Sequence, residues 1–91
     1  MIEKSLVRSL LRLPARYPRL VLVKTQGGPG RRGLPDLIGC YQGRALAWEV
    51  KVEGGVLTPL QARELERWSQ AGAMAAVIRS VEDAERLLRE A

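Results

Sequence analysis

A very short turn between two strand-like segments limits the folds open to this chain more than any other feature. Residues 36–41 and 44–51 are rich in apolar residues, and only Gln42-Gly43 separates them. A two-residue connection joins antiparallel strands in a hairpin, and the glycine can take the positive φ angle that such a turn needs. The sequence therefore predicts an antiparallel strand pair in the middle of the chain.

A helix, a strand and a loop are predicted before this hairpin. Apolar residues within residues 2–13 recur at the spacing of one helix face, and Pro14 and Pro18 close that segment. Residues 20–25 form an apolar run with β-branched valines, which indicates a strand. Residues 26–33 are rich in glycine and arginine and are expected to form a basic loop.

Two helices and one more strand are predicted after the hairpin. Thr58 is a good N-cap with Pro59 at the first helical position, so a helix should run from there to about Ala71. Residues 74–78 predict a buried strand, and Ser80 stands where it can cap a last helix. The resulting order, αβββαβα, predicts one α/β domain over residues 1–91, with a central sheet flanked by helices.

Composition narrows the classes of partner and of chemistry. Fifteen Lys and Arg against ten Asp and Glu give a net charge of +5, which favours polyanionic partners such as nucleic acid. A solvated basic surface with no special partner is the alternative. The absence of histidine excludes histidine-activated nucleophiles and imidazole metal ligands. Any metal must then be bound by oxygen, and oxygen ligands suit Mg²⁺, Mn²⁺ or Ca²⁺.

The cysteine content and the start of the chain predict a cytoplasmic location. Cys40 has no second thiol to pair with, which excludes a disulfide framework within one chain and favours a reducing, intracellular setting. Residues 1–13 mix charged and apolar side chains, unlike a signal peptide, and no stretch reaches the roughly 20 apolar residues of a membrane span. We expect a cytoplasmic protein, bacterial or phage-encoded, with no membrane partner.

Charged residues occur in the hairpin at positions that share one strand face. Alternation in residues 44–51 places Glu49 and Lys51 on a face otherwise lined by small alanines. Asp36, at the start of the preceding strand, should lie near Glu49 across the hairpin. Carboxylates this close raise each other's pKa unless a cation lies between them, so the pair predicts a hard divalent ion. A plain ion pair on an exposed sheet is the alternative.

Two further polar side chains fall within apolar helix stripes. Glu3 projects to the same side as Leu6 and Val7, either as a further metal or water ligand or as a glutamate tolerated at a helix start. Gln61 falls in the stripe of the helix that begins at Pro59. Its amide could orient a lysine, a water or a phosphate, or could simply be satisfied by backbone groups.

Basic residues near the carboxylates are candidate DNA contacts. Arg31 and Arg32 lie in the glycine-rich loop shortly before Asp36, and Lys24 belongs to the preceding strand. These cations could bind DNA phosphates beside the carboxylates. A merely solvated basic turn is the alternative.

Taken in order, these residues resemble a known group of nucleases. The chain has, in order, Glu3, Gly33-Leu34-Pro35-Asp36-Leu37-Ile38-Gly39, Glu49-Val50-Lys51 and Leu57-Thr58-Pro59-Leu60-Gln61. This pattern resembles the PD-(D/E)xK nuclease superfamily and, more narrowly, the VRR-NUC family of virus-type replication-repair nucleases. The resemblance covers nearly the whole chain. It implies a restriction-endonuclease-like α/β core with a mixed central sheet.

The resemblance also implies roles for individual residues. Asp36, Glu49 and the Val50 backbone carbonyl would bind one or two Mg²⁺ or Mn²⁺ ions, and Lys51 would position or activate the attacking water. Glu3, reaching the metal directly or through water, and Gln61 would complete the catalytic site. With a metal to polarise the phosphate, this chemistry needs no histidine.

A substrate and an assembly follow from the same resemblance. The chain is similar to stand-alone family members that act as homodimers on four-way DNA junctions, which predicts a Holliday junction resolvase in DNA repair or recombination. A nicking or flap nuclease working with a replication or recombination partner is one alternative, and a DNA-binding module that does not cleave is another. Leu20, Leu22 and the exposed side of the last helix are candidate dimer surfaces.

Overall fold

The computed structural model describes residues 2–26 and 33–91 of the chain. Within these residues the elements, in chain order, are α1 (Glu3–Leu10), a short 3₁₀ helix η1 (Leu13–Ala15), β1 (Leu20–Lys24), β2 (Leu37–Tyr41), β3 (Arg44–Val50), α2 (Pro59–Gln70), β4 (Met74–Ile78) and α3 (Val81–Glu90). The predicted order αβββαβα is confirmed, with η1 added between α1 and β1.

The strands form one mixed sheet. In the described part of the chain this sheet has four strands in the order β1-β2-β3-β4. β2 pairs antiparallel with both β1 and β3, whereas β3 and β4 are parallel. Parallel neighbours need a long crossover connection, and α2 supplies it. The predicted α/β fold with a mixed central sheet is therefore confirmed.

The predicted hairpin turn joins β2 to β3. Gln42 and Gly43 both have positive φ angles, 51° and 87°, as a tight two-residue hairpin turn requires. The turn sets the register, which pairs Tyr41 with Arg44 and Leu37 with Trp48. This register determines which face of the sheet each later residue of β3 occupies.

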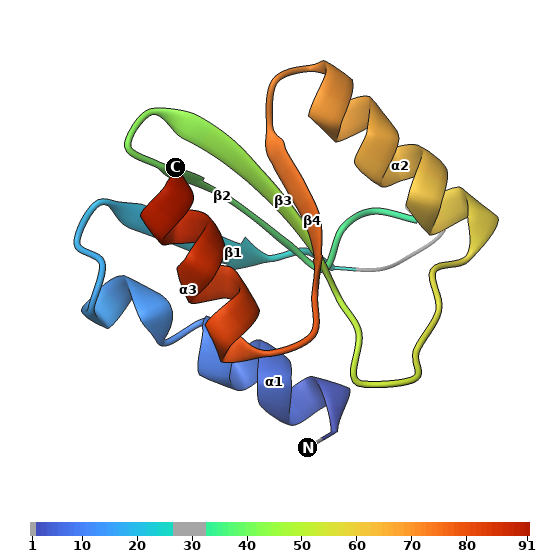
Figure 1. Cartoon of the computed structure of the whole chain (residues 1–91), viewed down its shortest axis with the longest axis horizontal. Coiled ribbons are helices and arrows are strands. Elements are labelled where there is room, and N and C mark those ends of the chain that lie inside the picture. The colour runs from blue at the N-terminus through green and yellow to red at the C-terminus, as the bar shows by residue number, and fades with distance from the viewer. Residues whose placement is uncertain (1, 27–32) are drawn as a thin grey trace.

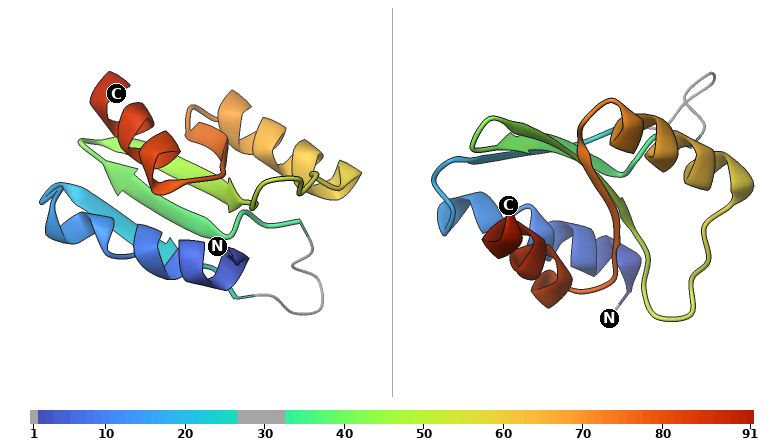
Figure 2. Two further views of the ribbon diagram at one scale, coloured as in Figure 1. Left: turned by 60° about the horizontal axis from the view of Figure 1, so that its bottom comes forward. Right: turned by 45° about the horizontal axis from the view of Figure 1, so that its top comes forward.

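α1 and α3 lie side by side on one face of the sheet, and α2 lies on the other (Figures 1 and 2). Alternation along β3 sends Leu46, Trp48 and Val50 to the face of α1 and α3, where all three are fully buried. The helical residues packed into the same core are Leu6, Val7, Leu10, Ala84 and Leu88. Burial of each large apolar side chain stabilises the fold by about 1.5–3 kcal/mol, so this layer holds the main core.

α2 covers only part of the opposite face. It packs on β3 and β4, where Ala47 is fully buried. Beside it, on β1, Val21 and Val23 are 59% and 53% exposed. The expectation that Leu20 and Leu22 form a dimer surface is wrong, because alternation turns both toward the core: Leu20 is 4% exposed, and Leu22 packs against the buried cluster.

The helices are short, and α1 ends earlier than predicted. Its last residue is Leu10, whereas the apolar pattern continues to Leu13, which is fully buried. The Arg12 N–H donates to the Ser9 carbonyl, an i to i−3 bond that tightens the chain, and Pro14 has no N–H to continue an α-helix. None of the helices in the described residues is long and apolar enough to cross a membrane.

Candidate active site

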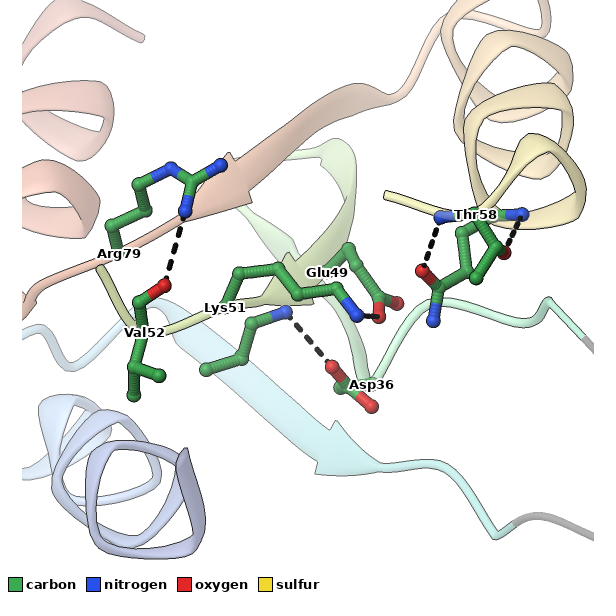
Figure 3. Close-up of polar contacts among 8 residues, drawn as sticks. Asp36, Glu49, Lys51, Val52, Thr58 and Arg79 are labelled. Atoms are coloured by element: carbon green, nitrogen blue, oxygen red, sulfur yellow. Dashed lines mark hydrogen bonds and ion pairs between the residues drawn. The ribbon is translucent and has the colours of Figure 1, made fainter. Parts of the chain in front are cut away.

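Asp36, Glu49 and Lys51 meet at the open end of the β2–β3 hairpin (Figure 3). The register pairs Leu37 with Trp48, so Asp36, one residue earlier, reaches the level of Glu49. Alternation along β3 puts Glu49 on the face of the sheet that carries α2. Lys51 follows β3, and its Nζ lies 3.8 Å from Oε2 of Glu49. The structure thus brings these three predicted site residues together.

Backbone contacts from two neighbouring strands hold Asp36. The Val50 N–H, on β3, donates to Oδ2 of Asp36 at 2.8 Å. Thr25, directly after β1, donates its N–H to the Asp36 carbonyl at 2.9 Å and its hydroxyl to the Pro35 carbonyl at 2.7 Å. Sequence reasoning did not identify Thr25. The sequence feature that could have identified Thr25 is a hydroxyl residue at the end of a strand that pairs with the strand after Pro35-Asp36.

Glu49 is buried with an incomplete set of partners. The residue is 2% exposed, and within the described chain its Oε1 has no hydrogen-bond partner. Burial raises the pKa of the Glu49 carboxyl to about 7, the negative charge of Asp36 adds to the rise, and the Lys51 ammonium opposes it. A buried oxygen without a partner is costly, so this position favours a bound proton or a cation.

The chain directly after β3 fixes Lys51. The Lys51 N–H donates to the Ile78 carbonyl at 3.1 Å, which continues the β3–β4 pairing one residue past β3. Nη1 of Arg79 donates to the Val52 carbonyl at 3.1 Å (Figure 3). The Lys51 side chain is 15% exposed, so most of it is removed from solvent while its ammonium lies beside Glu49. Sequence reasoning did not identify Arg79 either.

The oxygen donors at this end of the sheet fit a hard divalent cation. Asp36 and Glu49 supply carboxylates. The N–H and C=O of a strand residue project to the same side, so the Val50 carbonyl projects toward the side of Asp36, as its N–H does. Mg²⁺ commonly takes one or two protein carboxylates and completes its shell with water and phosphate. The unpartnered Glu49 Oε1 is an oxygen that such an ion would satisfy.

Glu3 and Lys24 open onto a groove that also reaches Asp36. This groove has a volume of about 350 Å³ and is lined by Glu3, Lys4, Val7, Lys24 and Asp36. The negative charge of Glu3 adds to the raised pKa of Glu49. However, within residues 2–26 and 33–91 no three Asp, Glu or Cys side chains lie close enough together to hold one metal ion. Glu3 therefore faces the site without forming a three-carboxylate cluster with the other two.

The remaining predicted DNA contacts cannot be placed. Arg31 and Arg32 lie outside the described residues. Of the three predicted DNA-contacting residues, Lys24 is therefore the one with a structural setting, on the wall of the groove. It is exposed at the end of β1.

Gln61 caps α2. Its Oε1 accepts a hydrogen bond from the Thr58 N–H at 3.0 Å, and its own N–H donates to Oγ1 of Thr58 at 3.1 Å. These reciprocal bonds form a capping box, so the side-chain oxygen is satisfied by the helix start. The Thr-x-x-Gln spacing could have revealed this from the sequence. The side-chain oxygen of Gln61 is thus used by the cap, and only its amide N–H groups could contact a substrate.

Comparison with solved structures adds information on the fold. No family model and no curated protein sequence matches this chain. A solved structure described as a VRR_NUC domain superposes with a TM-score of 0.77 at 27% sequence identity, covering 96% of this chain and 94% of that one. The two folds therefore agree over nearly their full lengths. With Asp36, Glu49 and Lys51 gathered at the sheet end, the chain resembles a VRR_NUC domain over its full fold and is a nuclease-type domain.

Proposed function

We propose that this protein is a Mg²⁺- or Mn²⁺-dependent endonuclease that hydrolyses phosphodiester bonds in DNA. The buried Glu49 carboxylate carries the proposal, because its Oε1 lacks a partner within the described chain while Asp36 and Lys51 lie beside it. A second carboxylate next to a buried one is unfavourable without positive charge. A divalent cation supplies that charge and suits ligands that are all oxygen.

Each residue has a distinct part in the proposed reaction. Asp36, Glu49 and the Val50 carbonyl would hold the metal, which would supply Lewis-acid activation of the phosphate and of a water. Lys51, close to Glu49 and largely removed from solvent, orients the attacking water and offsets negative charge that develops on the phosphate. The attacking water loses a proton to solvent as its oxygen bonds to phosphorus, the bond from phosphorus to O3′ breaks, and the departing 3′ oxygen takes a proton from solvent. Glu3, which lines the groove that reaches Asp36, and the Gln61 amide assist this reaction.

We propose four-way DNA junctions as the substrate and a homodimer as the active form. Symmetric resolution of a junction needs two cuts, and a twofold dimer provides two active sites from one short chain. The net charge of +5 favours association with a polyanion. An intracellular role in DNA repair or recombination follows from this substrate. A sedimentation experiment that finds only monomers at working concentration would remove the dimer from the proposal.

Cleavage of matched substrates tests the proposed function. A labelled four-way junction and a linear duplex of the same arm sequence are incubated with Mg²⁺, Mn²⁺ or EDTA. Wild type, Lys51→Ala and the control Arg63→Ala are compared, since Arg63 is exposed on α2. We expect paired, metal-dependent cuts in the junction that Lys51→Ala loses and Arg63→Ala keeps. Cutting of nicked or flapped duplexes instead would indicate a partner-dependent nuclease, and DNA binding without cleavage in any metal would indicate a binding module.

A further inference from the structure

The groove beside Asp36 carries a second basic residue that sequence reasoning did not identify. Lys4, in the first turn of α1, and Lys24, at the end of β1, both line this groove of about 350 Å³, with the apolar Val7 beside them. The two lysines lie 20 residues apart in the chain (positions 4 and 24), in α1 and β1, and are brought together by the fold. Asp36 lies in the same groove and belongs also to the carboxylate pair.

Neither lysine is engaged by an acidic side chain. In residues 2–26 and 33–91 the ion pairs are Arg16–Glu85, Lys51–Glu49, Arg67–Glu64 and Arg86–Asp83. Lys4 and Lys24 are exposed, so their ammonium groups remain available to a ligand. The carboxylates of Glu3 and Asp36 also line this groove.

The position of Lys4 is unfavourable for α1 itself. The first turn of a helix carries partial positive charge from its free N–H groups, so a cation there is unfavourable. Arg8, one turn later, lies at the favourable end of the same helix. A lysine at the start of α1 therefore gains nothing from the helix dipole.

We propose that Lys4 and Lys24 bind the backbone phosphate of DNA next to the scissile phosphate. Lysine ammonium groups act as compact point charges toward phosphate oxygens, and two of them along one groove can hold a phosphate from both sides. Because Asp36 lies in the groove and also in the carboxylate pair, a strand bound there leads directly into the site of cleavage. This inference rests on the proposed nuclease function, and it explains how the nuclease site would position its DNA substrate.

The salt dependence of DNA binding tests the proposal apart from catalysis. Affinity for a fluorescein-labelled duplex and junction is measured by anisotropy across a series of KCl concentrations, in EDTA and again with Ca²⁺. Each phosphate contact contributes about 0.9 to the slope of log affinity against log salt concentration. Because both lysines hold the same phosphate, we expect Lys4→Ala and Lys24→Ala each to lower the slope, and the double variant to lower it by about 0.9 in all. Arg8→Ala, on the same helix outside the groove, should leave the slope unchanged.

The possible outcomes separate this inference from the proposed function. Lys4→Ala and Arg8→Ala with equal slopes would overturn the phosphate site, even if the wild type cleaves DNA. A specific loss of slope in Lys4→Ala together with no cleavage in any metal would keep the phosphate site and reject the nuclease. Thermal unfolding of each variant is the control for folding, and Lys4→Ala should be at least as stable as wild type.

Discussion

The Val50 N–H donates to Oδ2 of Asp36 across 2.8 Å, so the backbone of one strand fixes a carboxylate of its neighbour. The same hydrogen bond ties the motif residues Asp36 and Glu49-Val50-Lys51 into one rigid unit at the sheet end. A hydrogen bond to the ionised carboxylate is stronger than one between neutral groups, which keeps Asp36 oriented before any ligand binds.

Asp36→Asn should separate the charge of Asp36 from its structural role. The asparagine oxygen can still accept the Val50 N–H, so the free energy of unfolding should change by less than about 1 kcal/mol. Cleavage should fall on the order of 100-fold or more, because a metal ligand loses its charge. Asp36→Ala also leaves the N–H unpaired and should cost about 1–3 kcal/mol of stability. Equal activity of wild type and Asp36→Asn would contradict the proposed metal site.

Glu49 should make the metal-free protein less stable as the pH rises. Its pKa is about 7 in the folded protein against 4.5 for the ordinary carboxyl, so between these values the folded state binds the extra proton. Stability is therefore full below pH 4.5 and declines through pH 7, by up to about 3 kcal/mol. Denaturant unfolding in EDTA at several pH values measures this. Glu49→Gln should remove this component of the pH dependence, and an unchanged profile in that variant would refute the assignment.

Divalent metal should stabilise the folded protein through the same carboxylates. A ligand at 100 times its Kd stabilises the state that binds it by about 2.7 kcal/mol. Saturating Mn²⁺ at pH 7 should raise the Tm of wild type by several degrees. Asp36→Asn and Glu49→Gln should lose this shift, whereas Glu53→Gln, an exposed carboxylate two residues past Lys51, should keep it. A shift of equal size in all four proteins would mean that the metal binds elsewhere.

Gln61 can be tested for a role beyond its cap. Glutamate at the same position can still accept the Thr58 N–H, but it lacks the amide N–H groups. Gln61→Glu should therefore unfold like wild type and cleave DNA more slowly if the amide assists the reaction, as we predict. Thr58→Ala removes the cap alone and should cost about 1 kcal/mol of stability. Full activity in Gln61→Glu would restrict Gln61 to the helix cap.

Local signals in the sequence predicted most of the fold. Gln42-Gly43 indicated the hairpin, and Thr58-Pro59 indicated the start of α2, because both depend on backbone preferences of adjacent residues. Alternation along β3 correctly placed Glu49 and Lys51 together. The hairpin then brought Asp36 to them, since its register follows from a two-residue turn.

Features that depend on packing between distant elements were not predictable in the same way. The sequence did not indicate that Glu49 would be almost wholly buried, because that depends on the elements that surround the open end of the hairpin. Nor did it indicate the groove that joins Lys4 to Lys24, or the contact of Arg79 with Val52. Leu20 and Leu22 were misjudged because a run of apolar residues on an edge strand does not show which face the core covers.

Gly39 should tolerate no side chain. A Cβ there would overlap the backbone carbonyl of Val21 on β1, so neither strand could stay in place. Gly39→Ala should lower the free energy of unfolding by at least about 2 kcal/mol. Cys40→Ala, at the next and exposed position, should stay within about 0.5 kcal/mol of wild type. Equal stability of the two variants in urea unfolding would contradict the close approach of β1 to β2.

This glycine has an effect far beyond its own volume, because it admits a single alignment of β1 against β2. A slip of one residue would set a side-chain-bearing residue against the Val21 carbonyl and would turn every β1 side chain to the opposite face. Lys24 would then leave the groove, and Thr25 would no longer meet Asp36. The smallest residue of the sheet, which pairs with Leu22, thus fixes the position of the charged end of the molecule two residue pairs away, at Lys24.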